Sequence, residues 1–162
     1  MPREFKDVTI ITDTREQWPL QFTRCQSVGG TLPTGDYAIQ GLEKFLCVER
    51  KSLPDLVACC CSKQRDRFEA ELMRMKAYRY KYLLVEATLN DIYTGDYRSQ
   101  ANPESVVGSL LSFSQKFDVH PILAGDREQS AKVVEHMALM VVRGLDETAK
   151  ALGYVKKKEK KE

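Results

Sequence analysis

Apolar residues recur along the chain with two kinds of spacing, which predict short strands alternating with longer helices. Val8–Thr12 is β-branched throughout, and Phe45–Arg50 and Tyr82–Ala87 each begin with an unbroken apolar run. Such runs are typical of strands that are buried on both faces of an α/β sheet. Two shorter strands are expected at Tyr37–Ile39 and Val119–Leu123. The pattern therefore predicts an α/β fold in which a meander feeds a mixed sheet.

Helical spacing fills the intervals between these strands. Phe68, Leu72 and Met75 recur at i, i+4 and i+7, which gives the helix expected at residues 65–77 an apolar stripe. Asn102-Pro103-Glu104 supplies an N-cap, a proline at the first helical position and an acid near the positive end of the helix dipole. The other helices are expected at 53–61, 102–116, 126–143 and 146–152, with a loop rich in Gly, Ser and Thr at 26–34.

Some single residues are assigned to the interior. Trp18 and Phe22 are read as core or DNA-facing residues, with the core preferred. Val133, Met137 and Met140 are expected to form the buried stripe of the helix at 126–143. The two histidines are given structural roles because neither lies near an acidic motif in the sequence.

Composition describes an ordinary soluble domain. The chain has 162 residues, 43% hydrophobic and 30% charged, a size that suits one domain with a full core. Neither a membrane-spanning apolar run nor the apolar core of a signal peptide is seen, so no membrane partner is expected. Five cysteines, three of them consecutive at Cys59–Cys61, match neither a secreted disulfide framework nor zinc-ligand spacing. An intracellular setting is expected, cytoplasmic in a bacterium or phage-infected cell and nuclear in a eukaryote.

Positive charge is concentrated in one segment and in the tail. The formal net charge is only +2, but residues 63–81 carry seven Lys or Arg against three acids, a local balance of +4. This segment is read either as a surface that faces nucleic acid or as a solvated helix face with pairs such as Glu71 with Arg74. Residues 153–162 are rich in lysine and are expected to be a disordered tail with nonspecific affinity for phosphate.

Acids and a lysine fall at the ends of two predicted strands. Asp36 precedes the strand at 37–39, whereas Glu49 and Lys51 end the strand at 45–50 and, being two apart, point to one face. Mg²⁺ is usually held by one or two carboxylates and keeps several waters, so Asp36 and Glu49 are candidate ligands. Gly-Asp is also a common turn signal, and Glu49 with Lys51 also fits an exposed cross-strand pair. Asp55 fits a capping box that begins at Ser52.

These residues resemble the signature of a known family. Gly35-Asp36-Tyr37, followed by Val48-Glu49-Arg50-Lys51-Ser52-Leu53-Pro54-Asp55, resembles the GDx…ERKxxxD motif of the XPF-type structure-specific DNA endonucleases, within the PD-(D/E)xK, restriction-enzyme-like superfamily. The resemblance extends upstream to Asp13-Thr14-Arg15-Glu16 and downstream to Arg67-Phe68 and Tyr82–Glu86. It covers roughly residues 8 to 142.

The resemblance implies a fold and a set of catalytic groups. Residues 1–152 are expected to form an XPF-like nuclease domain, with a restriction-endonuclease-like mixed central sheet flanked by helices. Mg²⁺, which Mn²⁺ can replace, would be held by Asp36 and Glu49 with Asp13 near them. In the same reading the Arg50 carbonyl is a further ligand and Lys51 stabilises the phosphate or orients the water. Asp55 supports the site, directly or by ordering its helix.

The resemblance also implies DNA as the partner, branched or flapped in structure. Arg15, Arg67, Lys63 and Arg65 are the expected nucleic-acid contacts, together with Arg98, which follows a second Thr-Gly-Asp-Tyr at 94–97 that is read as a turn or a DNA-facing loop. Because no helix-hairpin-helix or helicase module is seen after residue 143, a homodimer or a protein partner is expected to supply further DNA-binding modules. Such a short chain suits a minimal phage or bacterial enzyme. The alternatives are a non-catalytic binding or dimer-partner module of the same fold, and a nuclease for RNA or unbranched DNA.

Overall fold

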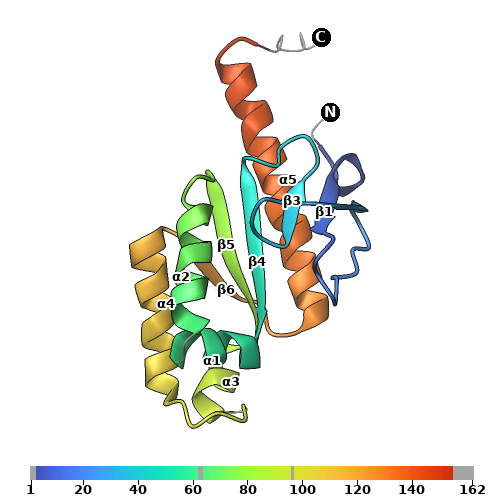
Figure 1. Cartoon of the computed structure of the whole chain (residues 1–162). Helices are drawn as coiled ribbons and strands as arrows, with labels where there is room; N and C mark the ends of the chain where they lie inside the picture. Colours follow the sequence, from blue (N-terminus) through green and yellow to red (C-terminus); the bar gives the residue numbers. More distant parts are fainter. Residues whose placement is uncertain (1–2, 62–63, 96, 155–162) are drawn as a thin grey trace.

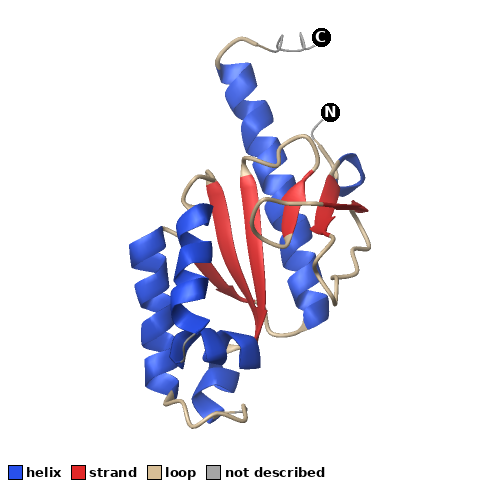
Figure 2. Ribbon diagram, in the orientation of Figure 1, coloured by secondary structure: helices blue, strands red, loops and turns tan. Residues whose placement is uncertain are grey.

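A six-stranded mixed sheet forms the centre of the molecule in the computed structural model, which describes residues 3–61, 64–95 and 97–154 (Figures 1 and 2). The strands follow the order β2-β1-β3-β4-β5-β6 across the sheet. β3 is antiparallel to both of its neighbours, whereas the other neighbouring pairs are parallel. The strands are β1 (Thr9–Asp13), β2 (Gln26–Gly30), β3 (Tyr37–Ile39), β4 (Leu46–Ser52), β5 (Tyr80–Glu86) and β6 (His120–Leu123).

Helices cover both faces of this sheet, which confirms the predicted α/β class. Figure 1 shows α5 behind the sheet, and α1, α2 and α4 on the other side. The helices are η1 (a 3-10 turn, Phe5–Asp7), α1 (Leu53–Cys61), α2 (Gln64–Met75), α3 (Leu89–Thr94), α4 (Pro103–Phe117) and α5 (Arg127–Ala151).

Strand β4 is buried on both faces, as its apolar run predicts. Cys47 packs into the cluster formed with α1, α2 and α4, whereas Leu46 and Val48 pack into the cluster formed with α5. Glu49 and Lys51 share the face of Cys47 because side chains alternate along a strand. The predicted stripe of α2 is also confirmed, since Phe68 and Leu72 lie in the first of these clusters.

The prediction of two helices after residue 126 was wrong. α5 is a single helix of 25 residues, and Gly144 lies inside it. A glycine within a helix costs about 1 kcal/mol, which packing along the rest of the helix can offset. The predicted stripe is confirmed only in part: Met137 is buried and Val133 packs against the core, but Met140 is 52% exposed. Val134, Ala138 and Val141 are buried as well.

Strand β2 and helix α3 were missed because their sequence signals are local and weak. The loop expected at 26–34 contains β2, an edge strand whose residues are mostly exposed and end in Gly29-Gly30, so it lacks an apolar pattern. α3 begins with a capping box in which Thr88 and Asp91 exchange hydrogen bonds, and it ends at Gly95 in the left-handed conformation. Neither segment has the apolar periodicity on which the predictions relied.

Single residues show mixed outcomes. Phe22 packs edge-to-face on Tyr37, in agreement with the preferred reading. Trp18 is 70% exposed, so the preference for the core was wrong at that residue. Cys59 and Cys60 are buried in α1 and Cys61 is exposed, in agreement with a partly buried helical turn. None of the helices in the described part of the chain combines the length and the apolar character needed to cross a bilayer.

Candidate active site

Strand direction brings three acidic residues to one edge of the sheet. β1 ends at Asp13, β4 ends just after Glu49, and the reversed strand β3 begins just after Asp36. Since β3 is antiparallel to both neighbours, its beginning lies beside their ends. The backbone fixes this arrangement: Asp36 N donates to Val48 O and Asp13 N donates to Asp36 O, each at 2.8 Å.

Gly35 permits the close approach of these strands. Its φ is +79°, in the region that favours glycine, and a Cβ at this position would lie 2.5 Å from Cys47 Sγ and 3.1 Å from Val48 O. The glycine of the Gly-Asp pair is therefore required by the packing of β3 against β4, and it sets where the Asp36 side chain emerges.

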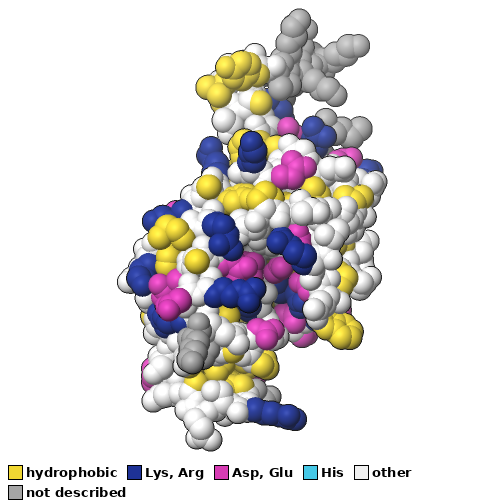
Figure 3. Space-filling model, in the orientation of Figure 1, with side chains coloured by type: hydrophobic (Ala, Val, Ile, Leu, Met, Phe, Trp, Pro, Cys, Tyr) yellow, Lys and Arg dark blue, Asp and Glu magenta, His cyan; other side chains and the backbone are white. Residues whose placement is uncertain are grey.

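Two adjoining hollows open at this edge. The smaller, of about 260 Å³, extends toward α2, and the larger, of about 420 Å³, extends toward the segment at residues 15–18. They share Arg15, Asp36 and Lys51. Figure 3 shows acidic side chains gathered in the middle of this face with lysines and arginines around them.

Asp36 is a partly desolvated carboxylate at the junction of the hollows. Its Oδ2 accepts a hydrogen bond from Arg50 N at 2.7 Å. Burial raises its pKa from 3.8 to about 6, helped by the negative charge of Glu16 and opposed by the Arg50 hydrogen bond and the Lys51 charge. A carboxylate of this kind is stabilised by any cation that binds beside it.

Glu49 is more deeply buried than Asp36. Its residue is 3% exposed, and burial together with the charge of Asp36 raises its pKa to about 7. Lys51 Nζ forms an ion pair with Glu49 Oε1 and also lies 5.1 Å from the centre of the Phe68 ring. Burial alone would lower the pKa of Lys51, but the charge and hydrogen bond of Glu49, together with the charges of Glu71 and Asp36, outweigh burial and raise it. Lys51 therefore remains an ammonium ion.

Asp13 has a different environment from the other two acids. Its Oδ1 accepts from Arg15 N and Nε, and its Oδ2 accepts from an Arg15 terminal nitrogen and from Leu32 N. The Arg15 hydrogen bond lowers the pKa of Asp13 to about 2 despite its burial. Both oxygens are thus engaged in holding Arg15 and the turn at Leu32, and Asp13 lines the wall of the smaller hollow.

Arg50 braces the site from the opposite face of β4. Its guanidinium donates to Glu16 at 2.9 Å and to Glu86 at 2.8 Å, which ties the segment after β1 to the end of β5. The arginine side chain is only 10% exposed. Glu16 and Glu86 belong to the stretches over which the family resemblance extends, and the structure shows that Arg50 is their common partner.

Asp55 takes part in the first turn of α1 and also lies at the wall of a hollow. Ser52 Oγ donates to Asp55 Oδ2 at 2.6 Å, and Asp55 N donates back to Ser52 Oγ at 3.3 Å, which fixes the first turn of α1. Asp55 also lines the larger hollow together with Ser52.

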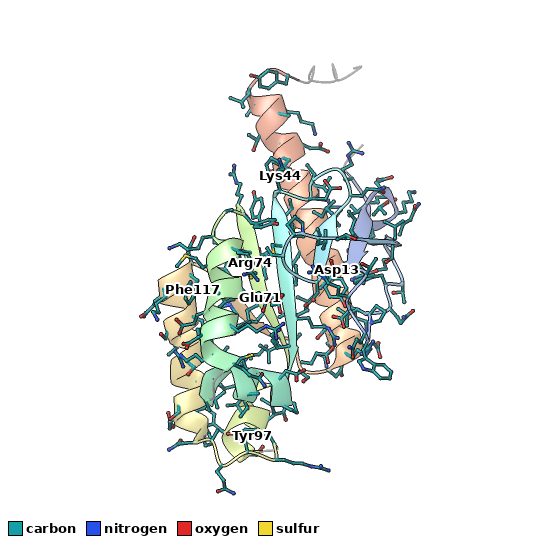
Figure 4. All side chains as sticks on the ribbon, in the orientation of Figure 1. Asp13, Lys44, Glu71, Arg74, Tyr97 and Phe117 are labelled. Atoms are coloured by element: carbon teal, nitrogen blue, oxygen red, sulfur yellow. The ribbon has the colours of Figure 1, made fainter. Side chains whose placement is uncertain are left out.

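Helix α2 contributes a polar face that the sequence reading only partly identified. Arg67, Glu71 and Arg74 all line the smaller hollow, and Figure 4 shows Glu71 and Arg74 directed from α2 toward the side of the sheet where Asp13 lies. Only Arg67 was predicted to contact the ligand. The sequence could have predicted this polar face, because positions 67, 71 and 74 have the i, i+4, i+7 spacing of one helix face.

Two other predicted contacts, Arg65 and Arg98, lie apart from the acids. Arg65 is bound within the helical layer, where it pairs with Glu69 at 2.9 Å and donates to Ser109 Oγ at 3.0 Å. Arg98 lines a separate hollow beside Pro54 and lies outside the two hollows of the acidic site. Lys63 lies outside the described residues. Arg127, at the start of α5, lines the larger hollow but was not predicted.

The donor set suits a magnesium ion that keeps much of its water. Across the described ranges, no three acid, histidine or cysteine side chains converge as a complete protein cage for a metal. Mg²⁺ needs only one or two carboxylates, and Asp36 and Glu49 both line the smaller hollow. The pKa of each is raised, partly by neighbouring negative charge, so a divalent cation would relieve a repulsion that already exists.

The fold of this chain is similar to that of solved structures of known proteins. XPF from Aeropyrum pernix superposes with a TM-score of 0.65 at 19% identity, over 88% of this chain and 69% of that one. The same protein in complex with DNA gives 0.66 at 19% identity, over 85% and 66%. These similarities confirm the predicted restriction-endonuclease-like mixed sheet flanked by helices.

The sequence then shows the family. Residues 2–137 match the ERCC4 domain, and the chain belongs to that family, as its motifs predicted. The 3'-flap repair endonuclease Xpf of Saccharolobus solfataricus is 33% identical over 110 residues, which are 66% of this chain and 42% of that protein. The chain thus spans about two fifths of the length of this relative.

Proposed function

We propose that this chain is a metal-dependent DNA endonuclease that hydrolyses phosphodiester bonds in branched or flapped DNA. The observation that carries the proposal is the pair of half-buried Asp36 and buried Glu49, both with raised pKa values, beside the ammonium of Lys51 in the smaller hollow. Membership of the ERCC4 domain family and similarity to a protein named a 3'-flap repair endonuclease support the choice of DNA as substrate.

Each residue of the site has a chemical role in this proposal. Asp36 and Glu49 would hold Mg²⁺, or Mn²⁺ in its place. The chemistry supplied with such an ion is activation of a water and neutralisation of charge on a phosphoryl oxygen. Lys51 remains charged and stabilises the extra negative charge that develops on the phosphate. The Arg50 N–H fixes the carboxylate of Asp36, and its guanidinium keeps the surrounding segments in place.

The arginines on the rim position the DNA backbone. Arg15 is held by Asp13 yet its side chain is 66% exposed, and Arg67 and Arg74 are exposed on α2. All three line the smaller hollow beside the acids. Contacts of this type carry no sequence information, which suits an enzyme that selects DNA by structure. In this arrangement Asp13 acts through Arg15 and the Leu32 turn.

The proposal extends to the organisation of the protein. We assign residues 1–152 to the nuclease domain and residues 153–162 to a basic tail, most of which lies outside the described residues. A second copy of the chain or a partner protein would supply further DNA-binding surface, because one domain of this size offers only a short path for a branched substrate.

Cleavage of a panel of labelled DNAs tests the proposal. The panel holds a single strand, a duplex, a flap, a splayed arm and a three-way junction, each with Mg²⁺, Mn²⁺ or EDTA, and RNA flaps of matched sequence. We expect metal-dependent cutting that is strongest on branched DNA and that falls at least about a hundredfold in Asp36→Ala and Glu49→Ala. Glu147→Ala, an exposed acid on α5, is the matched control and should cut normally.

The outcomes separate the alternatives. No cutting by folded wild type with either metal, combined with DNA binding, would favour a non-catalytic binding module. Equal cutting of RNA and DNA flaps, or of unbranched ends, would show that the site does the expected chemistry on a broader substrate class. Cutting that survives in both acid variants would contradict the assignment of the site.

A further inference from the structure

Trp18 is held in an unusual way beside the acidic site. Its backbone N–H donates to Glu16 Oε1 at 3.1 Å, and its carbonyl accepts from Arg50 at 3.1 Å and from Arg127 at 2.7 Å. The indole itself is 70% exposed. A single exposed aromatic is common on protein surfaces, but here the backbone is fixed by β4 and α5 while the side chain is left uncovered at the wall of the larger hollow.

The two flanks of the site differ in chemistry. On the α2 side, Arg67 and Arg74 are exposed and line the smaller hollow. On the other side, Arg50 is 10% exposed and bound to two carboxylates, and Arg127 donates to backbone carbonyls. Among the described residues that line these two hollows, Trp18 is the sole aromatic. Arg15, whose side chain is 66% exposed, and Lys51 line both hollows. The α2 flank therefore offers cations for phosphates, whereas the other flank adds an aromatic face on which a base can stack.

We propose that Trp18 is a positioning residue that stacks on an unpaired base next to the phosphodiester bond to be cut. This inference rests on the proposed function, and it would explain why branched or flapped DNA is the preferred substrate. A base within a continuous duplex is already stacked, and extracting it costs free energy that an unpaired base at a flap does not require. Stacking on an aromatic side chain tolerates any base, so Trp18 would favour a DNA structure rather than a sequence.

The chain offers a direct probe, because Trp18 is its only tryptophan. Intrinsic fluorescence of the wild-type protein is titrated with a 3'-flapped duplex and with a continuous duplex of the same length. Ca²⁺ replaces Mg²⁺, and a gel verifies that the DNA stays intact. Anisotropy of a fluorescein label on the DNA measures binding in parallel. We expect quenching of Trp18 emission by the flapped DNA and little quenching by the continuous duplex at equal occupancy.

Variants separate stacking from a merely structural role. Trp18→Ala should bind the flapped DNA about tenfold more weakly by anisotropy and the continuous duplex unchanged, since stacking on an aromatic contributes roughly that factor. Trp18→Phe keeps an aromatic face and should restore binding to within about threefold of wild type. Tyr154→Ala removes an aromatic that is 82% exposed at the far end of α5, and it should change neither DNA.

Several results would overturn the proposal, and they distinguish it from the nuclease assignment. Binding of flapped DNA with no change in Trp18 emission would remove the stacking role and leave the nuclease proposal standing. Equal losses on both DNAs in Trp18→Ala would show a general surface contact. A shift in Trp18 emission that depends on protein concentration without DNA would identify an interface between copies of the chain. Absence of DNA binding in the anisotropy assay, together with absence of cutting, would overturn both proposals.

Discussion

Two aspartates at the same edge of the sheet have opposite electrostatic environments. Asp13 accepts four hydrogen bonds, and the Arg15 contact lowers its pKa to about 2. Asp36 accepts one hydrogen bond from Arg50 N, and burial raises its pKa to about 6. Ionisation of Asp13 therefore stabilises the folded state, whereas ionisation of Asp36 opposes it. This difference separates an acid whose charge is compensated by Arg15 from an acid whose charge is only partly compensated.

We predict that Asp36→Asn stabilises the metal-free protein near pH 8. The amide oxygen can still accept from Arg50 N, and a repelling charge is removed. The folded carboxyl titrates near 6 and the ordinary group near 3.8, so the wild type loses stability as the pH rises between these values. The gain in the free energy of unfolding should be about 1–3 kcal/mol at pH 8 and should vanish below about pH 4. Urea denaturation in EDTA across this pH range measures it.

Asp13→Asn is the matched substitution and should have the opposite sign. Its carboxyl titrates near 2 in the folded state against an ordinary 3.8, so its contribution of about 2 kcal/mol is present above about pH 4 and is lost as the pH falls toward 2. Mg²⁺ should raise the stability of wild type and Asp13→Asn more than that of Asp36→Asn. Equal responses of both variants to Mg²⁺ would contradict the assignment of Asp36 as a ligand.

At the scale of elements, the reversed strand β3 explains how residues far apart in the sequence form one site. Its direction places Asp36 beside Glu49, and Gly35 allows its backbone to approach β4. The same tetrapeptide, Thr-Gly-Asp-Tyr, occurs at 94–97, where Gly95 forms the C-cap of α3. Identical sequences thus serve different purposes because the neighbouring elements differ.

The repeated tetrapeptide provides an internal control for a prediction. Gly35→Ala should cost about 2–4 kcal/mol, because the new Cβ would lie 2.5 Å from Cys47 Sγ at a φ of +79°. Gly95→Ala has the related φ of +68° but nothing within 4 Å, so it should cost about 1 kcal/mol. Gly35→Ala should also reduce cleavage about a hundredfold where it remains folded, because Asp36 is displaced. Thermal melts and the cleavage assay measure the two effects, and equal costs at both glycines would refute this account.

At the scale of the whole molecule, α5 fastens the N-terminal segments to the back of the sheet. Glu135 is 1% exposed, and its Oε1 accepts from the backbone N–H groups of Thr23, Arg24 and Cys25. Its Oε2 pairs with Arg24 Nε at 2.9 Å. One carboxylate on the helix thus fixes the approach to the edge strand β2, which has few buried side chains of its own.

Glu135→Ala should therefore destabilise the fold strongly. The substitution leaves three backbone donors and a partly buried arginine without their acceptor, a change that costs about 3 kcal/mol. For a chain of this size the midpoint of thermal unfolding should fall by roughly 6–12 °C. Hydrogen exchange should increase most in β2, since that strand loses its anchor. The exposed Glu147→Ala on the same helix should change stability by less than about 0.5 kcal/mol. A loss no larger than this control would argue against the anchoring role.

The sequence by itself determined the strands that carry the motif, the buried stripe of α2, the family, and the prominence of Asp36, Glu49 and Lys51. These features are local: apolar runs, helical spacing and a short motif that contains its own chemistry. Tertiary structure decided the rest. β2 is a strand because β1 pairs with it, and α5 continues through Gly144 because the sheet supports it. Arg50 and Arg127, which are distant in the sequence, fix the backbone of Trp18, and Asp36 differs from Asp13 because the fold buries its carboxyl group. These features depend on contacts between segments that are far apart in the chain, so a local sequence pattern does not predict them.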